Sequence, residues 1–128
     1  MGIFSVECLL ENQQTRTRSI LVRDVLVDTG SELTWISREH LTTIGIQAEK
    51  LNRQFVMANG ESITRSIGFA IIRVGEEVTT DEVVFAEGHE LQLLGARTLE
   101  GLNLRVDSRN KKLVAAGPHP AAGNLAIG

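Results

Sequence analysis

Apolar and polar residues alternate in short runs along most of this chain, a pattern typical of β-strands. Residues 3–9 and 19–22 show it and are predicted to be strands, joined across the polar residues 11–15. Residues 25–27 are wholly apolar, as expected of a strand that is buried on both faces. Further strands are predicted at residues 67–74, 82–86, 91–95, 104–107 and 112–114. The pattern therefore predicts an all-β fold.

Turn and cap residues place the remaining elements. Ser37 is suited to cap a single helical turn that Gly45 would end. Asn59-Gly60 lies between extended segments, which predicts a hairpin over residues 55–63. Residues 96–104 are predicted to form one short helix near the C-terminus.

Length and composition indicate one domain. The chain has 128 residues, enough for one modest core. Residues 1–114 are predicted to form that domain, and residues 115–128, rich in Ala, Gly and Pro, a flexible tail. The net charge of −3 with mixed signs gives no basic surface, so nucleic acid is not an expected partner. Cys8 is the sole cysteine, so no disulfide can form within the chain.

Targeting signals are sparse. Residues 1–7 lack the basic start and the apolar core of a signal peptide. No apolar run approaches the ~20 residues that cross a bilayer. We therefore expect a cytoplasmic protein that does not bind membranes, while a processed form in the cell envelope stays open.

Candidate chemistry lies where the apolar strand at residues 25–27 ends, in Asp28-Thr29-Gly30-Ser31. A lone carboxylate at such a position is costly to bury unless it has a function or hydrogen-bond partners. Gly30 permits a sharp backbone turn, and Thr29 can form hydrogen bonds locally. Ser31 either hydrogen-bonds Asp28, which would favour the ionised carboxylate, or caps the turn. The first reading predicts that Ser31→Ala moves the acidic limb of any activity to higher pH.

Three features follow one another in a characteristic order: Asp28-Thr29-Gly30, the Asn59-Gly60 hairpin, and Leu93-Leu94-Gly95 followed by a helix. This order resembles the retropepsin family, the dimeric retroviral-type aspartic proteases and their single-domain bacterial relatives. The resemblance covers roughly residues 3–114. It implies a closed, barrel-like β-fold with one short C-terminal helix.

The resemblance also implies roles for individual residues. Asp28 would be the catalytic aspartate, with Thr29 and Gly30 as its loop partners and Ser31 in support. Ala58, Asn59 and Gly60 would form the tip of a flap over the substrate, although a plain surface hairpin is the simpler reading of the same residues. Leu93, Leu94 and Gly95 would pack around the catalytic loop without chemistry of their own.

Catalysis of this kind needs two carboxylates, and the chain has one Asp-Thr-Gly. The resemblance therefore implies a homodimer with Asp28 of each copy at the two-fold axis, sharing a proton. One carboxylate would activate a water, and the other would protonate the peptide carbonyl of an extended polypeptide substrate. No cofactor and no metal is implied. The segment from Leu104 to Val114 is a candidate for the strands of the dimer interface.

Other residues have two readings. Arg97 resembles an arginine that pairs with an acidic residue near the catalytic loop, but a solvated helix charge fits equally well. Trp35 is expected in the core. His40, His89 and His119 lie far apart in sequence, so no metal site is expected.

Two functions compete with that of an aspartic endopeptidase. One is a catalytically weak or inactive module of the same fold that binds a peptide. The other is an assembly domain whose dimerisation is its function. An intact Asp28-Thr29-Gly30 favours the enzyme, because a pure binding module has no need of a buried charge.

Overall fold

Strands dominate the computed structural model, which describes residues 2–121. The strands are β1 (Gly2–Glu11), β2 (Ser19–Asp28), β3 (Thr34–Ser37), β4 (Lys50–Val56), β5 (Ser62–Val74), β6 (Glu77–Ala86), β7 (Leu93–Leu94), β8 (Leu104–Asp107) and β9 (Lys112–Ala115). Two short helices, α1 (Arg38–Thr43) and α2 (Ala96–Leu102), accompany them. The predicted all-β class is confirmed.

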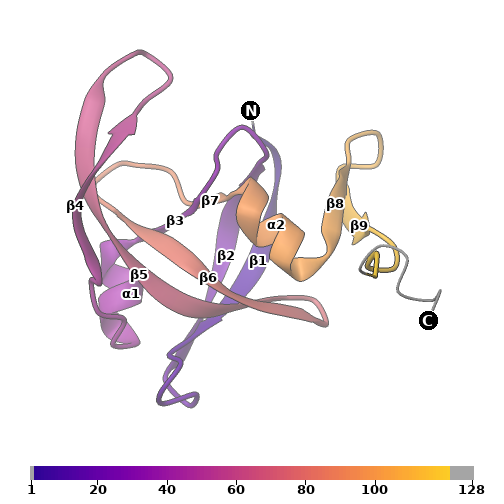
Figure 1. Ribbon diagram of the computed structural model, residues 1–128, viewed down its shortest axis with the longest axis horizontal. Coiled ribbons are helices and arrows are strands. Elements are labelled where there is room, and N and C mark those ends of the chain that lie inside the picture. The colour runs from indigo at the N-terminus through magenta and orange to yellow at the C-terminus, as the bar shows by residue number, and fades with distance from the viewer. Residues whose placement is uncertain (1, 122–128) are drawn as a thin grey trace.

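One sheet carries most of the molecule, with the strand order β1-β2-β7-β3-β6-β5-β4. Strand β1 also pairs with β5, so the sheet closes on itself, and β4 lies outside the ring. Figure 1 shows the β4–β5 hairpin extending away from the body, with α2 and the separate β8–β9 hairpin on the other side.

The core lies inside this ring. Apolar side chains from the strands and from both helices fill it, among them Leu10, Val25, Ile36, Leu41 and Leu99. Each such side chain stabilises the fold by about 1.5–3 kcal/mol when it leaves water. A smaller cluster around Trp35 and Val84 packs against Phe55, Met57 and Ile63 of the β4–β5 hairpin region.

Strands were predicted at residues 19–22 and 25–27, and in the structure both belong to the single strand β2. The polar residues Arg23 and Asp24 do not interrupt it, because both point to solvent while Val22 and Val25 remain buried. Arg23 also pairs with Glu7 across β1, with an N–O distance of 2.9 Å. The strand therefore runs unbroken to Asp28.

The sequence pattern missed strand β3. Its four residues are too few for an alternation to be read, but they pair in parallel with β6, from Thr34 beside Val83 to Ser37 beside Ala86. Ser37 then caps α1 as predicted, since its Oγ accepts a hydrogen bond from the His40 amide at 3.2 Å. Gly45, with φ +76°, follows the helix end.

The C-terminal hairpin packs onto the main core through Leu104, Val106 and Leu113. Backbone bonding continues past it, because the Ala116 amide donates to the Asn103 carbonyl at 2.9 Å. The boundary of a tail at residue 115 stays a prediction, and residues 122–128 of that tail lie outside the described residues. No helix in the described range is long and apolar enough to span a bilayer.

Candidate active site

The sheet order forces the Asp28 loop into a particular place. Strands β2 and β3 are separated by β7, which pairs with both. The loop from residue 28 to 33 therefore has to cross the end of β7 to connect its two neighbours. The chain beyond β7 then continues directly beneath this loop.

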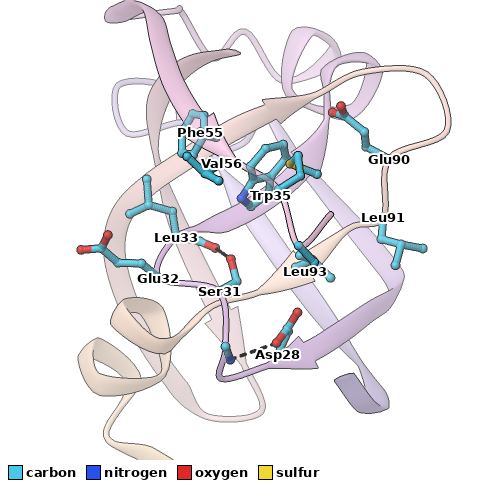
Figure 2. Close-up of a pocket in the computed structure, with 13 residues that line it drawn as sticks. Asp28, Ser31, Glu32, Leu33, Trp35, Phe55, Val56, Glu90, Leu91 and Leu93 are labelled. Atoms are coloured by element: carbon cyan, nitrogen blue, oxygen red, sulfur yellow. Dashed lines mark hydrogen bonds between the residues drawn. The ribbon is translucent and has the colours of Figure 1, made fainter. Parts of the chain in front are cut away.

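Asp28 is held at the end of β2 by a tight turn. Its Oδ1 accepts a hydrogen bond from the Gly30 amide at 2.9 Å, and its carbonyl accepts one from the Ser31 amide at 3.1 Å. The carboxylate is half-buried and lies on the floor of a cleft, beside Leu93 (Figure 2). Thr29 and Gly30 are exposed at the turn.

The Ser31 hydroxyl has a different acceptor from the one expected. Its Oγ donates to the Leu33 carbonyl at 2.7 Å, as the dashed line in Figure 2 shows. A hydroxyl has one proton to donate. Ser31 thus stabilises the turn, and its hydroxyl proton goes to Leu33 rather than to Asp28.

Gly95 allows the two crossing segments to approach each other. A Cβ added there would lie 2.4 Å from the Leu33 carbonyl oxygen, too close for any side chain. The next two amides, of Ala96 and Arg97, donate to the Ser31 and Glu32 carbonyls at 2.8 and 3.1 Å. The first turn of α2 thus uses its unpaired amides to hold the loop from below.

A buried chain of hydroxyl groups supports the same crossing. The Gly95 amide donates to Thr34 Oγ1 at 3.0 Å, and Thr34 Oγ1 lies 2.6 Å from Thr98 Oγ1. Because Thr98 donates its own proton to Asp81 Oδ2 at 2.8 Å, Thr34 is the donor to Thr98. Strands β3 and β6 and helix α2 are therefore joined under the loop.

Glu82, on β6, contacts strand β4 and helix α2 beside this network. Its nearly buried carboxylate accepts from Lys50 Nζ of β4 at 2.6 Å and contacts Arg97 Nη2 of α2 at 3.2 Å. The hydrogen bond from Lys50, with support from Arg97, lowers the pKa of Glu82 despite the opposing effect of burial. Arg97 Nη1 also lies 3.8 Å from Glu32 on the loop. The arginine is thus part of an ion-pair cluster rather than an isolated helix charge.

The predicted hairpin forms over this site. The Met57 amide donates to the Glu61 carbonyl and the Gly60 amide to the Met57 carbonyl, both at 2.8 Å. Gly60 has φ +89°, a conformation that favours glycine. Asn59 Oδ1 accepts from the Glu61 amide at 2.9 Å, so the amide side chain stabilises the turn.

A cleft of about 510 Å³ lies between the hairpin and the Asp28 loop. Side chains from four regions line it: the loop (Asp28, Ser31, Glu32, Leu33), β3 and β7 (Trp35, Leu93), the hairpin (Phe55, Val56, Met57, Ala58), and residues 87–92 (Glu90, Leu91). The Trp35 and Phe55 rings meet edge to face at 5.0 Å, joining the hairpin to the floor. Most of this lining is apolar, with carboxylates among it.

Comparison of the chain with known protein families gives one match. The family model described as "gag-polyprotein putative aspartyl protease" matches residues 22–101, from β2 through α2. The match spans more than half of the chain, including the Asp28 loop, the hairpin and Leu93-Leu94-Gly95. The chain belongs to this family. It therefore contains a retropepsin-like aspartyl protease domain, as the sequence resemblance indicated. No curated protein and no solved structure matches the chain.

The aspartyl protease domain brings together some of the candidate site residues. Asp28, Gly30, Ser31, Ala58 and Leu93 all line the cleft, whereas Leu94 and Gly95 are buried beneath the loop. Asn59 and Gly60 are exposed at the hairpin tip and are not among the residues that line the cleft.

Sequence reasoning missed much of the cleft lining. Trp35 is buried as expected, but it also forms part of the floor. Phe55, Val56 and Leu91 were not singled out at all. The signal for Phe55 and Met57 is their spacing of two residues, which places both side chains on the same face of an extended strand.

The described contacts of His40 are structural. His40 Nδ1 lies 2.9 Å from Gln92 Oε1, which also accepts from the Ser37 amide at 3.1 Å. His89 and His119 are exposed. Within residues 2–121, no group of three or more His, Cys, Asp or Glu side chains is placed to hold a metal ion. Metal-independent chemistry stays a prediction.

Proposed function

We propose that this protein is an aspartic endopeptidase that acts as a homodimer. The observation that carries the proposal is the Asp28-Thr29-Gly30 turn, fixed on the floor of a cleft beneath a hairpin, in a chain of the aspartyl protease family. The sequence has one such motif, whereas water activation by this chemistry uses two carboxylates. A second copy supplies the other Asp28 through a two-fold axis.

The two Asp28 carboxylates share one proton across that axis, because like charges so close together resist joint ionisation. The ionised member takes a proton from a water molecule, and that water attacks the peptide carbonyl carbon. The protonated member donates its proton to the carbonyl oxygen as the tetrahedral intermediate forms. As the C–N bond breaks, the carboxylic acid that took the water proton gives it to the leaving nitrogen, and a hydroxyl of the intermediate returns a proton to the other carboxylate. Two peptide products are released without a covalent enzyme adduct.

The cleft suits an extended polypeptide. Phe55, Trp35 and Leu91 give it apolar walls, which favours apolar side chains beside the cut bond. The hairpin offers backbone groups to a chain bound alongside it, in the manner of an added strand. The carboxylate on the floor then lies next to the backbone that it cleaves.

The test compares wild type with Asp28→Asn on a complex peptide mixture at several pH values, with cleavage sites read by mass spectrometry. Wild type is expected to produce cuts that Asp28→Asn does not, with apolar residues beside the cut at acidic to neutral pH. The amide keeps the shape of the side chain but cannot act as the base. Identical patterns from the two proteins, with both shown to be dimeric, would reject the proposal in favour of a peptide-binding module.

A further inference from the structure

An ion pair crosses from the flap hairpin to the opposite wall of the cleft. Arg65 lies on β5, and Glu90 lies in the wall loop, which we define as residues 87–92 between β6 and β7. Arg65 Nε donates to Glu90 Oε1 at 3.0 Å, and Nη2 makes a second, shorter contact with Oε2. Both side chains are 20% exposed, so this two-point contact is largely shielded from water.

The wall loop is anchored to the body at its other contacts. Within the loop, the Glu87 amide donates to Glu90 Oε1 at 2.8 Å. The contact with the body is made by the Gln92 carbonyl, which accepts from the Leu26 amide of β2 at 2.9 Å. His40 and the Ser37 amide hold the Gln92 side chain. The wall loop is therefore held in place, and its ion pair with Arg65 restrains the hairpin relative to the body.

The surroundings of Glu90 favour the ionised form of its carboxyl group. Burial raises the pKa of its carboxyl, but the Arg65 hydrogen bond and the Glu87 amide together more than offset that, so the pKa is lowered. The same contact raises the pKa of Arg65. Each partner thus stabilises the ionised form of the other.

The Arg65–Glu90 pair links two segments of the chain, each of which carries an exposed apolar side chain of the cleft. Val56 on the hairpin is 75% exposed and Leu91 on the wall loop is 65% exposed, and both line the cleft. Such surfaces leave water when another chain lies between them. Their separation depends on how the hairpin sits relative to the wall loop, which Arg65 and Glu90 bridge directly. Figure 2 shows Glu90 and Leu91 on the same wall, opposite Val56 and Phe55.

We propose that Arg65 and Glu90 are positioning residues that fix the flap hairpin to the wall loop and so set the width of the cleft for the substrate side chain. The inference rests on the proposed function for its kinetic consequence. Its structural part, a restrained hairpin, holds whether or not the protein cleaves peptides.

Amide hydrogen exchange tests the structural part directly. Arg65→Gln and Glu90→Gln are each expected to speed exchange in residues 55–63 by about tenfold, because the hairpin opens locally once the tie is lost. Glu87→Gln is the matched control. It removes an ion pair between the same loop and Arg38 of α1, with side chains 40% and 48% exposed, and leaves both hydrogen bonds between Arg65 and Glu90 in place. It is expected to leave the hairpin exchange unchanged.

The kinetic part uses a peptide taken from the cleavage test. Arg65→Gln and Glu90→Gln are expected to raise KM about fivefold or more while kcat stays near the wild-type value, since Asp28 is not touched. If the protein cleaves nothing, the proposed function fails, but the exchange result still decides the inference.

Two results would overturn the inference. One is hairpin exchange within about twofold of wild type in both single variants. The other is an equal rise in Glu87→Gln. Should the single variants not fold, Arg65→Glu combined with Glu90→Arg decides: a folded protein with a protected hairpin supports the inference, and an unprotected hairpin rejects it.

Discussion

At Gly95 the backbone passes so close to the Asp28 loop that one methyl group decides whether the loop fits. The added Cβ of Gly95→Ala would meet the Leu33 carbonyl carbon and oxygen at 2.6 and 2.4 Å. These are backbone atoms of the loop, which the Ala96 and Arg97 amides hold in place, so the strain cannot be relieved by a rotamer change. We expect Gly95→Ala to lower the free energy of unfolding, measured by urea denaturation, by about 1–3 kcal/mol.

Gly101 provides the control for that substitution. A Cβ there would meet Thr79 Oγ1 at 2.4 Å, but this atom is the end of a side chain that can rotate. Alanine also has a higher helix propensity than glycine, which favours helix α2. Gly101→Ala is therefore expected to stay within about 1 kcal/mol of wild type. Equal losses in the two variants would contradict the close crossing as the cause.

Residues whose roles depend on local geometry could be found from the sequence. Asp28-Thr29-Gly30 carries its turn in its own side chains, and Leu93-Leu94-Gly95 follows at a recognisable distance. Arg65 and Glu90 could not be found in this way, because 25 residues separate them and their pairing is created by the fold. The same holds for Thr34 and Thr98, 64 residues apart.

Among the elements, those that the sequence predicted well are those with enough residues to show a period. The hairpin of β4 and β5 was marked by Asn59-Gly60, and α2 by the helical pattern after Gly95. Strand β3, with four residues, was missed, and β7 comprises only two residues of the strand predicted at residues 91–95. Both are defined by pairing with distant strands rather than by their own composition. Yet these two strands frame the active-site loop.

Glu82 links strand β6 to β4 and to helix α2, and its charge should make that link depend on pH. The pKa of Glu82 is lowered in the folded protein from an ordinary value of 4.5, first through the Lys50 hydrogen bond and then through Arg97. A lowered pKa contributes stability that is complete above the unfolded-state pKa and lost as pH falls through the folded-state pKa. Glu82→Gln is expected to be less stable than wild type by about 1–2 kcal/mol near neutral pH, with the difference shrinking below about pH 4.5.

Urea midpoints for both proteins between about pH 3 and 7 measure this difference. The comparison has to be with the variant, because Glu11, whose pKa is lowered by the Arg16 hydrogen bond and by Arg73, titrates in the same direction. Glu7→Gln is the control, since it removes an exposed ion pair with Arg23 and is expected to change the midpoint little. A stability gap for Glu82→Gln that persists unchanged at pH 3 would exclude an electrostatic origin.

At the scale of the molecule, Asp28 lies at the end of strand β2 and lines the cleft. Figure 1 shows that the tip of the β4–β5 hairpin extends beyond the body of the molecule. Asn59 and Gly60 are at that tip. Segment 104–114 forms the β8–β9 hairpin, a separate two-stranded sheet with backbone edges for pairing with another chain. The assignment of the dimer sheet to this segment stays a prediction.

The need for two copies can be tested by mixing subunits. If each active site requires two Asp28 carboxylates, a dimer of one wild-type and one Asp28→Asn chain has no base–acid pair and is inactive. After subunits exchange freely, an equal amount of Asp28→Asn should reduce the activity of a fixed amount of wild type to about half, and a ninefold excess to about a tenth. A monomeric enzyme would keep its full activity in both mixtures.

Peptide hydrolysis at saturating substrate, after incubation for subunit exchange, measures this effect without competition for substrate. The same amounts of an unrelated protein control for crowding and adsorption. Specific activity of wild type alone should also rise with protein concentration until dimers dominate, because dilution favours monomers. Activity that is independent of both concentration and added Asp28→Asn, in a protein that cuts peptides, would place the whole catalytic apparatus in one chain and remove the reason for the two-fold axis.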